Sequence, residues 1–146
     1  MKRYYYSNNQ FLKDINKLYN RVKNEDFDAI IGVSRGGLSL AQMIAYKLNI
    51  RDLFTINSIS YDKNNSKIKP KIYNIPNLKD FNKILILDDI IDSGDTLYTI
   101  NKILYKKYPK TNFKIATIFY KETSIINANY SLYKTNDWIE FFWENL

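Results

Sequence analysis

The sequence contains no cysteine and no histidine, and only 4 glycines and 3 prolines among its 146 residues. Without cysteine the chain has no disulfides, no thiolate metal site and no cysteine nucleophile. Without histidine it lacks the usual general base and the commonest metal ligand, so acid–base chemistry must use Asp, Glu, Lys or Tyr. Sparse glycine and proline, with 45% hydrophobic residues, indicate a well-structured globular chain.

The sequence also lacks long apolar runs. No stretch approaches the roughly 20 residues needed to cross a bilayer, and the amino-terminal MKRYYYSNNQ has no apolar core of the kind found in secretory signals. We therefore expect a soluble, cytoplasmic protein; peripheral contact with a membrane stays open. The length fits a single domain, 1–146, with no internal repeat.

The formal charge is +7, from 22 Lys+Arg against 15 Asp+Glu, and such an excess is typical of nucleic-acid-binding proteins. However, the basic residues are scattered along the chain and do not form a patch in the sequence. A small polyanionic substrate accounts for the same charge. We therefore expect no nucleic-acid partner.

Helical and strand patterns alternate along the chain. Ser7 and Gln10 form a capping box, and the apolar spacing after them predicts a helix over 8–23. Further helices are expected over 40–48 and 97–107, and strands over 28–33, 53–60, 84–87 and 113–119. This alternation predicts an α/β fold, with a mostly parallel central sheet flanked by helices.

Two segments lack a clear period. Residues 61–76 are polar and basic with two prolines, so they are expected to form a long loop or a loose hairpin. Residues 125–146 show no regular pattern but end in an apolar, aromatic stretch.

The most informative segment is ILILDDIIDSGDT, residues 84–96. Its apolar run reads as a strand buried on both faces and ends in two carboxylates, Asp88 and Asp89, with Asp92 three residues later. We expect these acids on a loop at the carboxyl end of a strand, where α/β sheets bind ligands. The following helix start offers free N–H groups to a phosphate. Three acids beside a phosphate require a cation or a sugar between them, which points to a phosphorylated sugar with magnesium.

LDDIIDSGDT, together with VSRGGL near residue 34, resembles the type I phosphoribosyltransferases. SISYD near 60, TIFYK near 120 and DWIE near 138 follow in the same order, and the succession is similar to the bacterial xanthine-guanine (6-oxopurine) branch over nearly the whole chain. The resemblance implies a single-domain type I phosphoribosyltransferase fold. It also implies a small hood formed by the chain termini, with a base-binding part over 121–146, and a flexible active-site loop over 61–76.

By this resemblance, Asp88 and Asp89 hold the ribose hydroxyls and Mg²⁺, a hard cation that prefers oxygen ligands. The following loop, with Asp92 at its start, would hold the 5′-phosphate through backbone N–H groups and hydroxyls; its other residues are Ser93, Gly94, Asp95 and Thr96. Asp92 would face the purine N7 proton. Asp95 is the one acid of this segment to which we assign no role.

Ser34, Arg35 and Gly36 resemble the family's pyrophosphate loop, in which a non-proline cis peptide is expected between Ser34 and Arg35. Glycine lets the backbone approach an anion, and Arg35 adds charge and several donors. Ser60 and Tyr61 open the flexible loop that closes over pyrophosphate; its lysines, Lys67 and Lys69, would reach that anion. No Gly-x-x-x-x-Gly-Lys-[Ser/Thr] pattern occurs, so a P-loop NTPase is excluded.

For the base, the resemblance implies that Lys121 donates to the purine 6-oxo group, because lysine has donors and no acceptor. Trp138 would stack on the purine, and Ile139 and Glu140 would complete the base edge through their backbone. An inward carboxylate at Glu140 would accept from the 2-amino group of guanine and repel the 2-oxo group of xanthine; this is a hypothesis. Glu122, beside Lys121, has no assigned role.

The implied activity is purine salvage: transfer of the 5-phosphoribosyl group from phosphoribosyl pyrophosphate to N9 of guanine or xanthine, with hypoxanthine weaker. Asp92, Lys121 and Arg35 are the candidate catalytic residues, and a homodimer or homotetramer is expected. Three alternatives stay open: a non-catalytic regulator that senses phosphoribosyl pyrophosphate, a hypoxanthine-preferring enzyme and, more weakly, a pyrimidine or amino-sugar relative within the enzyme class. Lys121 and Trp138 favour the enzyme, since a sensor has no obvious use for a purine pocket.

Overall fold

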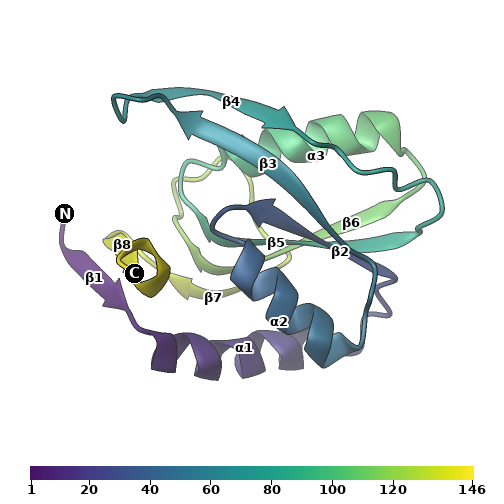
Figure 1. Cartoon of the computed structure of the whole chain (residues 1–146), viewed down its shortest axis with the longest axis horizontal. Coiled ribbons are helices and arrows are strands. Elements are labelled where there is room, and N and C mark those ends of the chain that lie inside the picture. The colour runs from purple at the N-terminus through teal and green to yellow at the C-terminus, as the bar shows by residue number, and fades with distance from the viewer.

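The computed structural model describes all residues, 1–146, and contains two β-sheets and three α-helices (Figure 1). The elements in chain order are β1 (Arg3–Tyr6), α1 (Asn8–Val22), β2 (Ala29–Ser34), α2 (Leu38–Leu48), β3 (Leu53–Tyr61), β4 (Lys67–Tyr73), β5 (Lys83–Ile91), α3 (Asp95–Lys107), β6 (Asn112–Tyr120), β7 (Tyr130–Lys134), β8 (Trp138–Phe141) and the 3₁₀ turn η1 (Phe142–Glu144).

The central sheet has six strands in the order β4-β3-β2-β5-β6-β7, and every neighbouring pair is parallel except β3 with β4. Helices α1 and α2 cover one face and α3 covers the other (Figure 1). The predicted α/β fold with a mostly parallel sheet is therefore confirmed. No helix is long and apolar enough to cross a membrane.

Strand β5 is buried on both faces, as its continuous apolar run predicts. Leu85 and Leu87 belong to the core beneath α1 and α2, whereas Ile84 and Ile86 belong to the core beneath α3. The side chains of a strand alternate between the two faces, so one short run serves both cores. This places the end of β5 in the middle of the sheet, between β2 and β6.

The predicted position of the acids relative to β5 was wrong by a few residues. The strand continues to Ile91, so Asp88 and Asp89 lie within it, and Asp88 is in register with Thr117 of β6. Parallel pairing with β6 carries the strand past its apolar run. The connection to α3 is therefore short and contains Asp92, Ser93 and Gly94.

Residues 61–76 form one arm of a hairpin. Of the two predicted forms, a long loop or a loose hairpin, the structure therefore has the hairpin. Strand β4 pairs antiparallel with β3 as far as Tyr61 and Lys67. Asp62 closes the turn, because its carboxylate accepts from the N–H groups of Asn64 and Ser66, both at 2.8 Å. Pro70 is tolerated because β4 is an edge strand.

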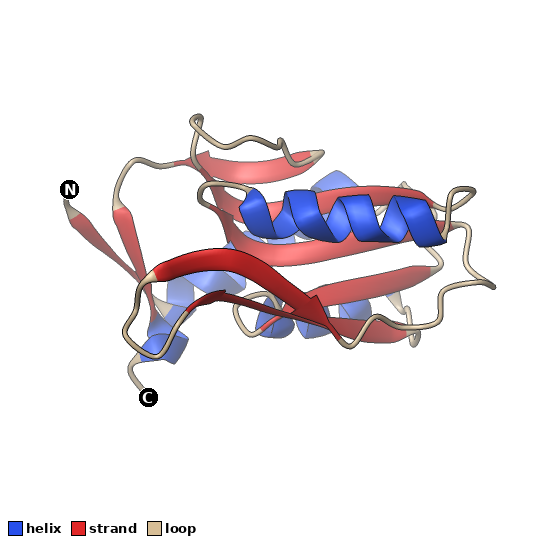
Figure 2. Cartoon of the chain, turned by 90° about the horizontal axis from the view of Figure 1, so that it is seen from above, coloured by secondary structure: helices blue, strands red, loops and turns tan.

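Three strands near the chain ends were not predicted. Strand β7 extends the central sheet, and β1 pairs in parallel with β8 to form a separate two-stranded sheet. Figures 1 and 2 show this small sheet and the tip of the β3–β4 hairpin at the same end of the molecule. That end is also where the parallel strands of the central sheet reach their carboxyl termini.

Candidate active site

The candidate site lies at the carboxyl ends of three adjacent parallel strands, β2, β5 and β6. The Ser-Arg-Gly-Gly turn follows β2, the acidic segment ends β5, and Lys121 follows β6. Because neighbouring parallel strands end at the same edge of a sheet, side chains far apart in the sequence are brought together here.

Asp88 and Asp89 form a pair of carboxylates in a poorly solvated place. Asp88 is buried and Asp89 is half-buried. Burial raises the pKa of Asp88 well above its usual value, and the neighbouring Asp89 raises it further. Burial also raises the pKa of Asp89 to about 6, and Glu144 contributes by repulsion. The Ile90 N–H donates to Asp89 at 2.7 Å, which offsets part of this cost. Two such carboxylates without a lysine or arginine partner make a favourable place for a cation.

The turn after β2 packs directly on this pair. A Cβ on Gly36 would lie 2.1 Å from a carboxylate oxygen of Asp89, and one on Gly37 would lie 2.4 Å from the Leu87 carbonyl oxygen. Only glycine fits at either position. The peptide between Ser34 and Arg35 is cis, as the family resemblance implied.

Arg35 is exposed and forms no ion pair within the chain. Ser34 is tied to the hairpin: the Asn57 side-chain amide donates to its Oγ at 3.2 Å, and Asn57 in turn accepts from Asn74 at 3.2 Å. Sequence reasoning missed this relay. Asn57 sits in an alternating strand pattern that gives no signal of its link to the loop.

The connection from β5 to α3 turns at Gly94, which has φ +87 and so uses the backbone freedom of glycine. A Cβ there would meet Ser124 Oγ at 2.3 Å, because the chain after β6 packs against this turn. The Ile125 N–H donates to the Ser93 carbonyl at 3.0 Å and fixes the same contact. Sequence reasoning also missed Ser124.

The first turn of α3 meets the hairpin. Asp95 forms an ion pair with Lys67 at 2.8 Å and accepts from the Ser93 hydroxyl at 2.8 Å. Lys67 lowers the pKa of Asp95, and Asp95 in turn raises the pKa of Lys67. The hydroxyls of Ser60 and Thr96 lie 2.9 Å apart. The hairpin is thus held against the start of α3 by two polar contacts.

Lys121 and Asp92 form a second ion pair, at 2.7 Å. The lysine side chain is mostly buried, with 15% exposed, whereas the Asp92 side chain is half exposed. The Lys121 N–H donates to the Ile91 carbonyl at 2.9 Å, which fixes the backbone beside the end of β5. A buried ammonium next to a carboxylate offers a strong donor and a strong acceptor side by side.

The remaining predicted residues belong to the carboxyl-terminal part of the chain and to the β3–β4 hairpin. Trp138 is half exposed on β8, and the Ile139 side chain is buried in the core. Tyr61 and Lys69 are exposed on the hairpin. Glu140 accepts from the Asn145 side chain at 2.5 Å, and Glu122 pairs with Lys134 at 2.7 Å.

A model of the phosphoribosyl transferase domain matches residues 3–145, almost the whole chain. The chain belongs to the phosphoribosyltransferase family. The xanthine-guanine phosphoribosyltransferase of Cereibacter sphaeroides is 30% identical over 126 residues, covering 83% of this chain and 71% of that protein. The protein of the same name from Idiomarina loihiensis is 26% identical over 151 residues, covering 96% and 90%.

Solved structures give the same result. The xanthine-guanine-hypoxanthine phosphoribosyltransferase of Helicobacter pylori superposes with a TM-score of 0.89 at 36% identity, over 98% of this chain and 94% of that one. A purine phosphoribosyltransferase from Pyrococcus horikoshii has a TM-score of 0.83 at 30% identity, over 100% and 96%. The chain is therefore a glycosyltransferase of the purine phosphoribosyltransferase group, with the type I fold.

The donor set of this phosphoribosyltransferase suits Mg²⁺ more than a transition metal. No cluster of three or more Asp, Glu, His or Cys side chains is positioned to hold a metal ion by itself. Mg²⁺ is commonly held by one or two carboxylates, with water and substrate oxygens completing its coordination. Asp88 and Asp89 provide such a pair, and their raised pKa values fit a site that gains from a cation.

Proposed function

We propose that the chain transfers the 5-phosphoribosyl group of phosphoribosyl pyrophosphate to N9 of guanine or xanthine, with hypoxanthine a weaker substrate, and releases pyrophosphate. The observation that carries this proposal is the Lys121–Asp92 pair, 2.7 Å apart, at the mouth of the Gly94 turn. A 6-oxopurine presents an acceptor at O6 next to a proton at N7. Lys121 and Asp92 have the complementary donor and acceptor.

The acidic segment and the turn after β2 would bind the sugar donor. The N–H groups at the start of α3, with the Ser93 and Thr96 hydroxyls, suit the 5′-phosphate. Arg35, exposed and without a partner, suits the pyrophosphate. Asp88 and Asp89 would hold the ribose hydroxyls and Mg²⁺, whose bound charge would stabilise the departing pyrophosphate.

In the proposed reaction, the bond from C1′ of the ribose to the pyrophosphate oxygen breaks and a bond from C1′ to purine N9 forms. The purine loses one proton, and Asp92 is placed to accept it from N7. Lys121 holds O6, which orients N9 and stabilises charge on the ring. Positioned acid–base groups typically contribute about 10²–10⁴-fold to such steps. The Arg35 guanidinium balances the charge that the leaving pyrophosphate gains.

Two lysines of the free chain neutralise acids that substrate would contact. Lys121 is paired with Asp92, and Lys67 is paired with Asp95. Binding of purine would exchange the first pair for contacts with O6 and N7. Binding of the sugar donor would exchange the second pair, so that Lys67 turns toward the pyrophosphate and the hairpin closes over it. Closure would keep water from the sugar cation.

Base selection would depend on the carboxyl-terminal segment. Trp138, half exposed, offers an indole face for stacking, with backbone groups of Ile139 and Glu140 at the purine edge. The Glu140 carboxylate is held by Asn145, which limits where it can point. We propose that it favours guanine over xanthine; equal kcat/KM values for the two bases would contradict this.

A steady-state assay tests the proposal directly. The chain is incubated with phosphoribosyl pyrophosphate, Mg²⁺ and each of guanine, xanthine, hypoxanthine, adenine and uracil. We expect turnover with the 6-oxopurines and none with adenine or uracil. Tight binding of the sugar donor without turnover of any base would favour the regulator instead.

We also propose that the enzyme works in the cytoplasm as a homodimer or homotetramer. The family resemblance implies that the pyrophosphate loop lies near subunit contacts, and here the exposed Leu38 of α2 follows the exposed Arg35 by three residues. Sedimentation velocity measures the assembly, and a monomer at all concentrations would contradict it.

A further inference from the structure

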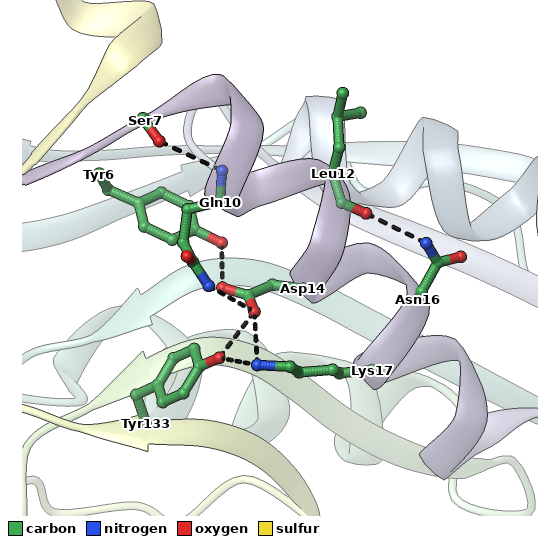
Figure 3. A network of polar contacts seen from close by, with 8 residues as sticks. All are labelled: Tyr6, Ser7, Gln10, Leu12, Asp14, Asn16, Lys17 and Tyr133. Atoms are coloured by element: carbon green, nitrogen blue, oxygen red, sulfur yellow. Dashed lines mark hydrogen bonds and ion pairs between the residues drawn. The ribbon is translucent and has the colours of Figure 1, made fainter.

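One carboxylate lies in the core, away from the acidic segment. Asp14 is fully buried on the face of α1 that carries Phe11, Ile15 and Leu18. Its oxygens accept from the Tyr6 hydroxyl at 2.7 Å, the Tyr133 hydroxyl at 2.7 Å and the Gln10 amide at 3.1 Å (Figure 3). Burying a carboxylate is costly unless it is well satisfied, so this network has to be complete.

Lys17 completes the network from the surface. Its ammonium lies 3.4 Å from an Asp14 oxygen and donates to the Tyr133 hydroxyl at 2.6 Å. The contacts with Tyr133 and Asp14 raise the pKa of Lys17, so the positive charge is retained. Burial and the hydrogen bond to Asp14 raise the pKa of the Tyr6 hydroxyl. Tyr6 therefore remains a neutral donor to Asp14.

The two tyrosines belong to the two sheets. Tyr6 ends β1, which pairs with β8 in the register that places Arg3 beside Trp138 and Tyr6 beside Phe141. Tyr133 lies in β7, in register with Phe119 of β6. Asp14 is thus bonded to a strand of the terminal sheet and to the edge strand of the central sheet at once.

These two attachments lie close to the proposed purine contacts. Phe119 lies two residues before Lys121, and Tyr133 is separated from Trp138 only by a short connection. The aromatic rings of Tyr6 and Tyr133 both pack on Phe119, with centroids 5.1 and 5.7 Å away. Phe119 therefore contacts one tyrosine from each sheet, and both of these tyrosines donate to Asp14.

We infer that Asp14 is a positioning residue that sets the distance between Lys121 and Trp138, and so the fit of the purine between its 6-oxo donor and its stacking surface. This inference rests on the proposed function. Asp14 touches no substrate and acts through Tyr6 on β1–β8 and through Tyr133 on β6–β7. We expect its effect to fall on the base, because its two tyrosine partners lie on β1 and β7 and belong to none of the segments proposed to hold the sugar donor.

The test compares two tyrosines of the same strand. Tyr133→Phe removes one donor to Asp14, while Tyr130→Phe removes a hydroxyl near Glu25 at the other end of β7. We expect Tyr133→Phe to raise KM for guanine about three- to tenfold, as loss of one hydrogen bond does, with KM for phosphoribosyl pyrophosphate unchanged. Asp14→Asn, which weakens every contact of the network, should show the same selectivity with a larger factor. Tyr130→Phe should leave both KM values unchanged.

A second readout needs no substrate. In a Trp143→Phe background, Trp138 is the only tryptophan, and its quenching by acrylamide reports how β8 sits. We expect Tyr133→Phe and Asp14→Asn to change the quenching constant and Tyr130→Phe not to. If the chain turned over no purine but the quenching constant still changed in these variants, the proposed function would be contradicted and the positioning of β8 by Asp14 would stand. Unchanged quenching, or KM values for base and sugar donor that rise together, would overturn the inference.

Discussion

The acidic segment contains two pairs of carboxylates that meet opposite conditions within eight residues. Asp88 and Asp89 lie in the strand, the first buried and the second half-buried, and have no lysine or arginine partner. Asp92 and Asp95 lie beyond the strand, are half exposed or nearly so, and each pairs with a lysine from another element. One sequence motif therefore contains two carboxylates without a cationic partner and two that are paired with lysine.

The difference follows from where β5 ends. Within the strand, β2 and β6 flank the carboxylates, and burial raises their pKa values. Because no lysine or arginine of the chain pairs with them, a cation that balances their charge has to come from solution. After the strand, the hairpin and the chain that follows β6 lie within reach of the carboxylates. Lys67 from the hairpin and Lys121 from after β6 therefore balance the negative charges of Asp95 and Asp92. Under the proposed function, the first pair binds Mg²⁺ and the second pair is opened by the substrate.

Removal of one strand carboxylate should have the largest effect. Asp89→Asn keeps the shape but loses the charge that would bind Mg²⁺, and we expect kcat/KM for phosphoribosyl pyrophosphate to fall about 10²–10³-fold. Asp80→Asn is the control, because Asp80 is exposed and forms no ion pair. A loss below tenfold for Asp89→Asn would remove the proposed distinction between the pairs.

The lysine that pairs with Asp92 comes next. Lys121→Met keeps the length of the side chain but loses the donor to O6. Because hydrogen bonds to charged groups contribute about 1.5–3 kcal/mol, we expect kcat/KM for guanine to fall by a factor of roughly 10–150. KM for the sugar donor should be unchanged. Lys134→Met, which breaks the exposed pair with Glu122, is the matched control and should behave as wild type.

The strand pair also predicts a pH dependence of stability. The pKa of Asp89 is about 6 in the folded chain, above its ordinary value of 3.8, so the folded state binds this proton more tightly than the unfolded state. The stabilisation is present below pH 4 and is lost as pH rises through 6. With chelator present, we expect the free energy of unfolding to fall by about 1–3 kcal/mol between pH 4 and pH 7. Denaturant titrations measure this.

Two comparisons sharpen the pH experiment. Asp89→Asn should show a shallower fall, because only Asp88 then titrates in the buried pair. Added Mg²⁺ should flatten the wild-type curve near pH 7, since it binds the ionised pair. If the free energy of unfolding of the wild type instead rose from pH 4 to pH 7 in chelator, the ionised forms of these carboxylates would have to be stabilised by a cationic partner that the structure does not contain.

The same contrast explains what the sequence could predict. The Ile84–Leu87 run specifies a strand buried on both faces, and the Asn8–Val22 helix follows its N-cap, Ser7, because both signals are local. The strands β1 and β8 pair across almost the full chain length and bury few side chains, so no local period marks them. Strand β4 is exposed and basic, and only its pairing with β3 makes it a strand.

The candidate site also has parts that a local motif predicts and parts that depend on contacts between distant elements. The segment with Asp88, Asp89 and Gly94 could be located from its motif, because its strand–turn–helix pattern is contiguous. The pairing of Asp95 with Lys67 could not, since it depends on how the hairpin packs on α3. Asn57 and Ser124 were missed for that reason: each supports a loop from an element that has no signal of its own.

The smallest expected effect concerns Asp95, the acid without a role in the sequence. Asp95→Asn keeps an acceptor for Ser93 but loses the pair with Lys67 and removes a negative charge beside the proposed phosphate site. An exposed ion pair contributes about 0.2–1 kcal/mol, so we expect KM for phosphoribosyl pyrophosphate to fall about two- to fivefold, with little change in stability. Lys67→Ala loses the same pair but removes the cation that would meet pyrophosphate, so its KM should rise. If both variants raised KM, the Asp95–Lys67 contact would be part of the closed, substrate-bound hairpin; opposite changes would place it in the free enzyme alone.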